Sequence, residues 1–271
     1  MNPSLSGLEM EYTGERVVPG ATPEITFRES QMRYAFAAQF VRGRRVVDIA
    51  SGSGIGTAFL QRAGAQACIG IDLDHAALRY AGSRFGLRQL AACDASRLCL
   101  APESVEVMVS FETIEHVADP AIFLSECWRV LCFGGWLICS TPNREITRWD
   151  PANPFHVAEM RTADFGQSVR NVFRDCRLYG QGAVDYPFYV ARRKIGGTLE
   201  RLGLKQWARR RLRLPVDPVC EEIEFSDARQ DERFRVLAPL PRWPNKTRYV
   251  IAVARKLKWA TAKPAPGHCR P

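Results

Sequence analysis

Short segments that are apolar along most of their length alternate with segments of helical spacing over the first 180 residues. Strands are expected over 44–50, 67–74, 88–95, 105–112 and 135–142, and helices near 28–43, 75–86 and 119–131. A strand with one face in water alternates apolar and polar residues, whereas a strand buried on both faces is apolar throughout. The pattern therefore predicts an α/β, Rossmann-like doubly wound sheet with helices on both faces.

Later segments complete this sheet. A helix over 158–173 and a strand over 174–182 follow, and 247–257 has the pattern of a last strand, which makes a mostly parallel sheet of seven strands. The expected regions are an N-terminal strap and lid helix (1–43), a ligand-binding Rossmann-like core (44–184), a basic helical insertion that caps the substrate side (185–240), the final strand (241–258) and a disordered tail (259–271).

The composition is typical of a globular protein with one substantial core, at 46% hydrophobic and 25% charged residues. The chain has no apolar run of 18 residues, and its first residues lack a basic stretch followed by an apolar one. We therefore expect a cytoplasmic protein. The nine cysteines are scattered without a C-x-x-C pair, which favours buried free thiols over disulfides or a cysteine zinc site.

The formal net charge of +9 is concentrated in residues 192–214, where Leu and Trp are interleaved with Arg at near-helical spacing. This pattern suits peripheral contact with an anionic membrane, at the inner membrane face, or with a phosphorylated, lipid-linked glycan. A solvated helix that covers the active site is the alternative. Nucleic acid is not an expected partner, because the chain shows neither an added RNA-binding module nor an aromatic stacking platform.

The turn after the first strand reads DIASGSGIG and leads into a helix. Gly52 and Gly54 permit backbone geometry that a side chain would block, so a ligand can contact the main chain at a helix N-terminus. The nicotinamide pattern G-x-G-x-x-G is not met, because Thr57 stands at its last position and Asp48 precedes the glycines. The turn predicts a nucleotide-like ligand whose positively charged part lies near a carboxylate.

Two more acidic residues end predicted strands. Asp72 lies 20 residues beyond Gly52, where a carboxylate can accept both hydrogen bonds of a ribose diol, and Asp94 is placed to meet an exocyclic amine. A helix cap or tight turn without a ligand is the alternative for each. The expected cofactor-binding residues are Asp48, Ala50, Ser51, Gly52, Gly54, Asp72, Leu73, Asp94, Ala95 and Phe111.

These motifs resemble those of the class I S-adenosylmethionine-dependent methyltransferases. The matching segments are VVDIASGSG, GIDLD, ACDAS, VMVSFETIEHV and LCFGGWLICSTPNR, and the resemblance covers roughly residues 13 to 180 and the final strand. The chain departs from the family at Ala50 and Ser51, where Gly and Cys are common, and at Glu106, where Asp is usual. The resemblance implies S-adenosylmethionine as cofactor and methyl transfer as reaction.

The segment FETIEHV contains the candidate catalytic residues. In a helical turn, Glu112, Glu115 and His116 would share one face, and His156 would lie on a loop above the same sheet edge. The four side chains could hold a divalent metal such as Mg²⁺ or Mn²⁺, or act as acid and base. A similar E-x-x-E-H with a later histidine occurs in small-RNA 3′-terminal ribose methyltransferases and in relatives acting on catechol-like rings. There it implies a metal that grips adjacent hydroxyls. Solvated carboxylates and a packed histidine are the alternative.

A sugar hydroxyl is a poor nucleophile until its proton leaves, so we expect His116, with Glu112 and His156, to act as base or as metal ligand. The segments TGERVVPG, RYAFAA, STPNR and NPFHVAEM resemble bacterial methyltransferases associated with surface polysaccharide or glycosylated natural products. This resemblance implies O-methylation of a sugar or glycosylated small molecule. Residues 13–16 and Tyr34 would then form a lid over the cofactor, or else a strap that packs on the sheet.

Three other functions remain open from the sequence. An RNA ribose 2′-O-methyltransferase is favoured by the net charge and by the E-x-x-E-H resemblance. A non-catalytic S-adenosylmethionine-binding partner protein would keep the fold without the chemistry, but the glycines and acids are intact. A nicotinamide-dependent sugar dehydrogenase or epimerase is disfavoured by the glycine spacing and by the lack of a Tyr-x-x-x-Lys pair.

Overall fold

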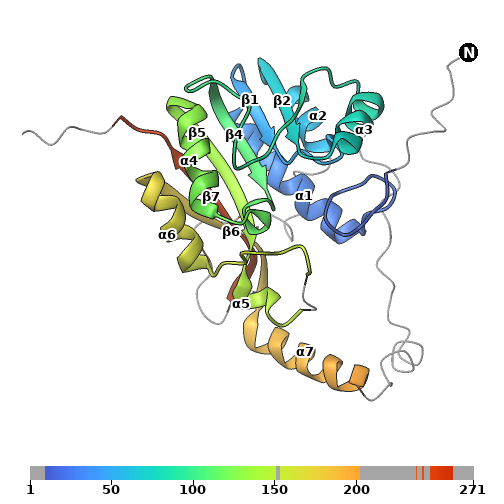
Figure 1. Ribbon diagram of the computed structural model, residues 1–271. Helices are drawn as coiled ribbons and strands as arrows, with labels where there is room; N and C mark the ends of the chain where they lie inside the picture. The colour runs from blue at the N-terminus through green and yellow to red at the C-terminus, as the bar shows by residue number, and fades with distance from the viewer. Residues whose placement is uncertain (1–9, 151–152, 202–235, 237–239, 241–244, 259–271) are drawn as a thin grey trace, which may run out of the picture.

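A seven-stranded sheet forms the centre of the computed structural model, which describes residues 10–150, 153–201, 236, 240 and 245–258 (Figure 1). The strands are β1 (Arg45–Ile49), β2 (Ala67–Asp72), β3 (Leu90–Ala92), β4 (Val105–Phe111), β5 (Leu131–Pro142), β6 (Asp175–Asp185) and β7 (Asn245–Arg255). Their order is β3-β2-β1-β4-β5-β7-β6. Strands β1 to β5 pair in parallel, and β7 is antiparallel to β5 and β6. The predicted Rossmann-like, mostly parallel sheet is confirmed.

Helices cover both faces of the sheet (Figure 1). The helices are α1 (Glu24–Ala37), η1 (Ala38–Phe40), α2 (Ile55–Arg62), α3 (His75–Phe85), η2 (Ile114–His116), α4 (Pro120–Val130), α5 (Arg144–Thr147), α6 (Thr162–Val172) and α7 (Tyr186–Arg201). Val46 of β1 packs in a core cluster with residues of α1 and α2, whereas its neighbour Val47 packs with residues of α4 and α6. Successive strand residues point to opposite faces. Because both faces are covered, the central strands β1 and β4 are buried along most of their length.

Local sequence signals set the ends of two helices that flank the sheet. Asp74 caps α3 by accepting a hydrogen bond from the backbone N–H of Ala76 at 2.7 Å, and Gly86, at φ +68°, ends the same helix. Asp119 caps α4, which begins with Pro120. These caps explain why the predicted bounds of both helices lie within a residue of the observed ones.

The predicted basic insertion is described only in part. Residues 186–201 form α7, which extends away from the sheet (Figure 1). Most of the basic segment 192–214 and the whole tail 259–271 lie outside the described residues, so the cap over the substrate side and the disordered tail stay predictions. Among the helices that the structure describes, none is both long and apolar enough to cross a membrane.

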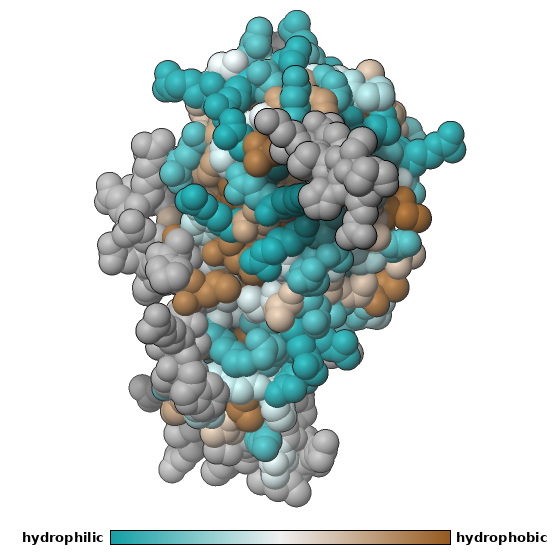
Figure 2. All heavy atoms as spheres, turned by 90° about the vertical axis from the view of Figure 1, so that its left-hand side faces the viewer, coloured by the Kyte–Doolittle hydropathy of each residue, from teal (hydrophilic) through white to brown (hydrophobic). Residues whose placement is uncertain are grey.

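The side of the molecule that lies on the left of Figure 1 faces the viewer in Figure 2. Its described residues are mainly hydrophilic, and the hydrophobic ones form small separate groups. The described cysteines are free: Cys68, Cys127 and Cys139 are buried, Cys93, Cys132 and Cys176 are half-buried, and Cys99 is exposed. The expectation of buried thiols therefore holds for three of these seven.

Candidate active site

A cavity of about 750 Å³ opens where β1, β2 and β4 end. Its wall includes residues 50–53 after β1, Asp72 and Leu73 at the end of β2, and residues 111–113 at the end of β4. Ligands of open α/β sheets bind at the carboxyl ends of the strands. The volume lies in the upper part of the range of roughly 300–1,000 Å³ that is usual for ligand pockets. The cavity has room for a cofactor and a second small molecule.

The glycine turn forms one side of this cavity, but its glycines serve different purposes. Gly52, at φ +53°, lines the cavity, and its N–H donates to the Asp72 carboxylate at 2.7 Å. Gly54, at φ +79°, does not line the cavity. A Cβ on Gly54 would lie 2.4 Å from the Cβ of Ala81, so this glycine allows α3 to approach the turn. Gly54 therefore has a packing role, and its contact with a ligand stays a prediction.

Asp72 presents a carboxylate that suits a nucleoside. The Asp72 carboxylate accepts from the backbone N–H groups of Gly52 and of Asp74, the latter at 2.9 Å, which orients it at the cavity edge. Ser51 also lines the cavity, but its Oγ is fully buried beside Gly70 of β2 and does not reach the cavity. Leu73 is 71% exposed beside them and offers apolar surface to a base. The residues fit an adenosine-containing cofactor.

Asp48 lies in the protein interior, where it binds other side chains, and it is not part of the cavity wall. Its carboxylate is fully buried and accepts from the Tyr34 hydroxyl at 3.1 Å and from Thr57 Oγ1 at 2.7 Å. Burial raises the pKa of Asp48 to about 7, and the two hydrogen bonds act against this rise. Its carboxylate thus holds α1 and α2 together, and its place near the charged part of a ligand stays a prediction.

Six of the ten predicted cofactor residues line the cavity: Ala50, Ser51, Gly52, Asp72, Leu73 and Phe111. Asp48, Gly54, Asp94 and Ala95 do not. Asp94 is exposed, and its carboxylate accepts from the backbone N–H of Ser96 at 2.7 Å, so it stabilises its own turn. A carboxylate at the end of a strand can cap its own turn or bind a cofactor, and the sequence pattern is the same in both cases.

The N-terminal strap, residues 10–22, crosses the glycine turn and contributes residues 14–17 to the cavity wall. Arg16 forms an ion pair with Asp74 at 2.5 Å, and Ser53 Oγ donates to the carbonyl of Val17 at 2.6 Å. Glu15 accepts from Asn153 Nδ2 at 2.9 Å. The strap thus packs on the turn and also lines the cavity, and its role as a lid over the cofactor stays a prediction.

The segment from Glu112 to His116 does not form the single helical turn that the sequence suggested. Glu112 follows β4 with φ +53°, and only the last three residues form η2. Glu112 accepts from Ser140 Oγ at 2.5 Å, and the buried Glu115 accepts from Thr141 Oγ1 at 3.2 Å. Both carboxylates line the cavity, but they are directed to β5 and do not share a face with His116.

Glu115 and Arg33 are buried charged residues in the same wall. Burial raises the pKa of Glu115 well above its usual range, and the nearby Glu112 carboxylate raises it further. Glu115 Oε1 has no hydrogen-bond partner within the part of the chain that the structure describes. Burial acts to lower the pKa of Arg33, but Glu112 and other acidic neighbours raise it overall. Arg33 stays a cation and balances the Glu112 charge.

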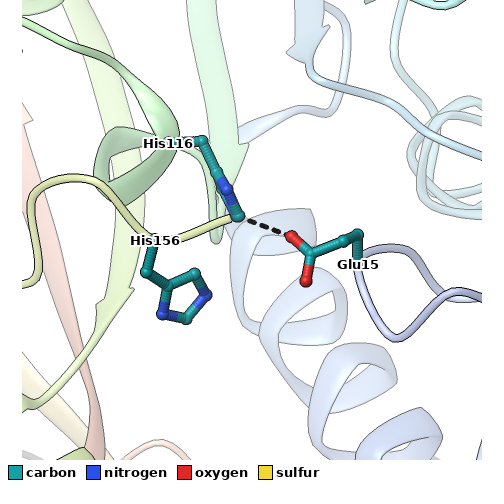
Figure 3. A group of neighbouring side chains, drawn as sticks. All are labelled: Glu15, His116 and His156. Atoms are coloured by element: carbon teal, nitrogen blue, oxygen red, sulfur yellow. Dashed lines mark ion pairs between the residues drawn. The ribbon is translucent and has the colours of Figure 1, made fainter. Parts of the chain in front are cut away.

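His116, His156 and Glu15 converge at the cavity from three separate segments: η2, the loop after α5 and the strap (Figure 3). One ring nitrogen of each histidine and one oxygen of Glu15 lie within 4.8 Å of one another, with His116 Nε2 3.5 Å from Glu15 Oε2. Of the predicted metal ligands, only the two histidines belong to this group. Glu112 and Glu115 are not part of it, and Glu15 provides the carboxylate. In the sequence, Glu15 was marked only by its position in the segment TGER, which the resemblance places near the cofactor.

Hydrogen bonds fix the tautomer of both rings. His116 Nδ1 lies 3.0 Å from the carbonyl oxygen of Phe155, which accepts only. His156 Nδ1 lies 2.6 Å from Glu159 Oε1. In the neutral rings Nδ1 therefore carries the proton and Nε2 keeps its lone pair. An unprotonated ring nitrogen at a cavity can accept a proton from a substrate or bind a cation.

Comparisons with known proteins agree with this geometry. Residues 47–139 match the family described as a methyltransferase domain. A probable S-adenosylmethionine-dependent methyltransferase of Mycolicibacterium smegmatis is 38% identical over 160 residues, 57% of this chain and 62% of the relative. A ubiquinone biosynthesis O-methyltransferase of Methylococcus capsulatus is 34% identical over 126 residues, 43% of this chain and 51% of the relative. The chain spans less than two thirds of the length of either relative.

The fold is also shared with solved structures. A methyltransferase structure from Thermotoga maritima superimposes with a TM-score of 0.55 at 18% identity, over 86% of this chain and 93% of that one. At this identity the likeness concerns the fold. Residues 47–139 thus match a methyltransferase domain, and the chain has the Rossmann-like fold of the class I S-adenosylmethionine-dependent methyltransferases.

Proposed function

We propose that this protein transfers a methyl group from S-adenosylmethionine to a hydroxyl of a sugar or glycosylated small molecule. The observation that carries the proposal is that one cavity brings together the glycine turn, the Asp72 carboxylate and the lone pair of His116 Nε2. A cofactor side and a proton-accepting side thus face one space. Methyl transfer to oxygen needs both.

S-adenosylmethionine supplies an electrophilic methyl group bonded to a sulfonium. The chain's own residues bind and orient this cofactor. Asp72 would accept hydrogen bonds from the ribose hydroxyls. Leu73 and Phe111 would offer apolar surface. Asp94 and Ala95 stay predicted contacts on the adenine side.

The acceptor side has to align a hydroxyl and remove its proton. His116 Nε2 is held as an acceptor and is placed to act as the base or as a ligand of a metal ion that lowers the hydroxyl pKa. His156 and Glu112 line the same space. Further polar side chains in the wall can hydrogen-bond to several hydroxyls of one acceptor: Arg33, Thr147, Asp150, Asn153, Arg248 and Tyr249.

The relatives support methyl transfer, and the name of the ubiquinone biosynthesis O-methyltransferase supports oxygen as the acceptor atom. Acidic residues (Glu15, Glu112 and Asp150) and basic residues (Arg16, Arg33 and Arg248) both line the cavity, so its wall is not the basic surface that binds the phosphates of an RNA. The RNA ribose methyltransferase is therefore the less favoured function. Peripheral contact with an anionic membrane through 192–214 remains part of the proposal, supported by exposed Arg192 and Lys194 on α7.

Calorimetric titration with S-adenosylhomocysteine, followed by assays of methyl transfer to saccharide acceptors, tests the proposal. We expect micromolar binding, and we expect His116→Ala to lower kcat by about 100-fold or more without a change in cofactor affinity. His75→Ala, which removes an exposed histidine at the start of α3, is the control. A folded protein that does not bind S-adenosylhomocysteine would refute the function. A loss below about threefold for His116→Ala would exclude His116 from the chemistry.

A further inference from the structure

We propose that Glu15, His116 and His156 form a binding site for one divalent transition-metal ion, which joins the N-terminal strap to the sheet edge (Figure 3). Binding of the ion does not depend on the proposed function, but its use in activating an acceptor hydroxyl rests on that function. The site differs from the one expected from E-x-x-E-H, because its carboxylate comes from the strap.

The separations of the three ligand atoms suit a single ion. His116 Nε2 and Glu15 Oε2 are 3.5 Å apart, and all three atoms lie within 4.8 Å of one another. Ligand atoms at 2.0–2.1 Å from a tetrahedral ion are about 3.3 Å apart. The pair from His116 and Glu15 already has nearly this spacing, and a small movement of the His156 side chain completes it.

The hydrogen bonds around the site leave the ligand atoms as acceptors. His116 Nδ1–H donates to the carbonyl oxygen of Phe155. In the neutral ring, Nε2 therefore carries the lone pair and faces Glu15. Asn153 binds the other oxygen of Glu15 at 2.9 Å, which directs Oε2 to the ring. Two acceptors at 3.5 Å repel each other unless a cation or a proton lies between them. A bound cation or a proton on His116 Nε2 therefore stabilises the arrangement.

His156 has the outer contacts that are usual for a metal-bound histidine. Its Nδ1 lies 2.6 Å from Glu159 Oε1, and Thr147 Oγ1 donates to Glu159 Oε2 at 2.6 Å. A carboxylate behind a ligating imidazole orients the ring and makes Nε2 a stronger ligand. The same loop thus provides a ligand and the group that orients it.

The ligand set also indicates which ions fit. Two imidazole nitrogens and one carboxylate favour Mn²⁺, Fe²⁺, Ni²⁺ or Zn²⁺, whereas Mg²⁺ and Ca²⁺ prefer oxygen. Three protein ligands leave coordination positions open, as in catalytic metal sites. All three residues line the cavity, so oxygen atoms of an acceptor can take these positions.

Mn²⁺ added to the chelator-treated full chain is the probe, because it prefers oxygen and nitrogen to the thiols of this cysteine-rich protein. Electron paramagnetic resonance measures the loss of the free-ion signal, and calorimetry measures the affinity. We expect one Mn²⁺ per chain at micromolar affinity, and at least about tenfold weaker binding for Glu15→Gln, His116→Ala and His156→Ala. Glu159→Gln should weaken binding by about 10–100-fold through the His156 ring.

Two variants serve as matched controls, since each removes a side chain of the same kind outside the site. Glu11→Gln changes an exposed strap carboxylate, and His75→Ala an exposed histidine. Both should bind Mn²⁺ like the wild type. Tighter binding of Mg²⁺ than of Mn²⁺ would contradict the ligand chemistry.

Two results would overturn the site: a dissociation constant above about 1 mM, or equal affinity of the wild type and the His156→Ala protein. If Mn²⁺ does not bind while His116→Ala still abolishes methyl transfer, His116 is a base that pairs with Glu15 when protonated, and only the metal site fails. Titration of the same samples with S-adenosylhomocysteine tests the proposed function separately, because the glycine turn and Asp72 lie outside the metal group.

Discussion

The hydroxyl of Tyr34 lies 3.1 Å from Oδ1 of the buried Asp48, and the ring reaches it through the space beside Gly56. A Cβ on Gly56 would lie only 1.9 Å from Cζ of Tyr34. The last glycine of the turn therefore serves a contact within the protein. This contact fixes α1, whose Arg33 and Tyr34 form part of the cavity wall, against the glycine turn.

Gly56→Ala tests this contact. Because the added methyl group would displace the Tyr34 ring, we expect the free energy of unfolding to fall by about 1–3 kcal/mol. Gly82→Ala is the matched control, since Gly82 also lies in a helix but a Cβ there would meet its nearest atom at 3.4 Å. It should be neutral or stabilising by up to about 1 kcal/mol. Urea denaturation measures both, and equal stability of the two variants would argue against the Tyr34 contact.

Asp48 should make the stability depend on pH. Burial raises its pKa from 3.8 to about 7, so between these values the folded state holds a proton that the unfolded state has lost. The free energy of unfolding therefore falls as pH rises through this window, by an amount on the order of a few kcal/mol. In Asp48→Asn the side chain is neutral at every pH, so its free energy of unfolding should not show this decrease. Denaturation of both proteins at about pH 5 and pH 8 measures the difference, and parallel profiles would contradict the assignment.

Asp72 and Asp94 should differ in their effect on the cofactor. Asp72 lines the cavity, so Asp72→Ala should weaken S-adenosylhomocysteine binding by about tenfold to 100-fold, the loss of hydrogen bonds to a charged group. Asp94 is exposed and outside the wall, so Asp94→Ala should cost no more than about tenfold. Calorimetry with both variants decides, and equal losses would show that the adenine side extends to the turn after β3.

The ion pair between Arg16 and Asp74 should hold the strap without adding much stability. Its side chains are 28% and 41% exposed, and such pairs contribute at most about 1 kcal/mol. Arg16→Ala should leave the unfolding midpoint nearly unchanged but speed up backbone hydrogen exchange in residues 12–20. Arg28→Ala breaks a similarly exposed pair with Glu24 inside α1 and is the control. If both variants exchange alike in the strap, Arg16 does not anchor it.

Hydrophobic patterning was enough to predict the sheet and its helices. A strand is recognised by whether its successive residues are apolar on one face or on both. The start of a helix is marked by a cap such as Asp74 or Asp119. Both signals lie within short stretches of the chain. The position of the cavity followed as well, because the ends of parallel strands meet at one edge. The family motifs lie at these ends, where Gly52 and Asp72 line the cavity as expected.

The sequence pattern could not show which side chains meet across the fold. A reversed φ at Glu112 directs its carboxylate to Ser140, so the expected face of E-x-x-E-H does not form. The Tyr34 hydroxyl donates to the carboxylate of Asp48, and the carboxylate of Glu15 in the strap lies beside His116 Nε2. Such contacts depend on how separate elements pack and on the conformation of single residues, which the periodicity of a sequence does not record. The chemistry of the candidate site is therefore a property of tertiary packing, whereas its location is a property of the pattern.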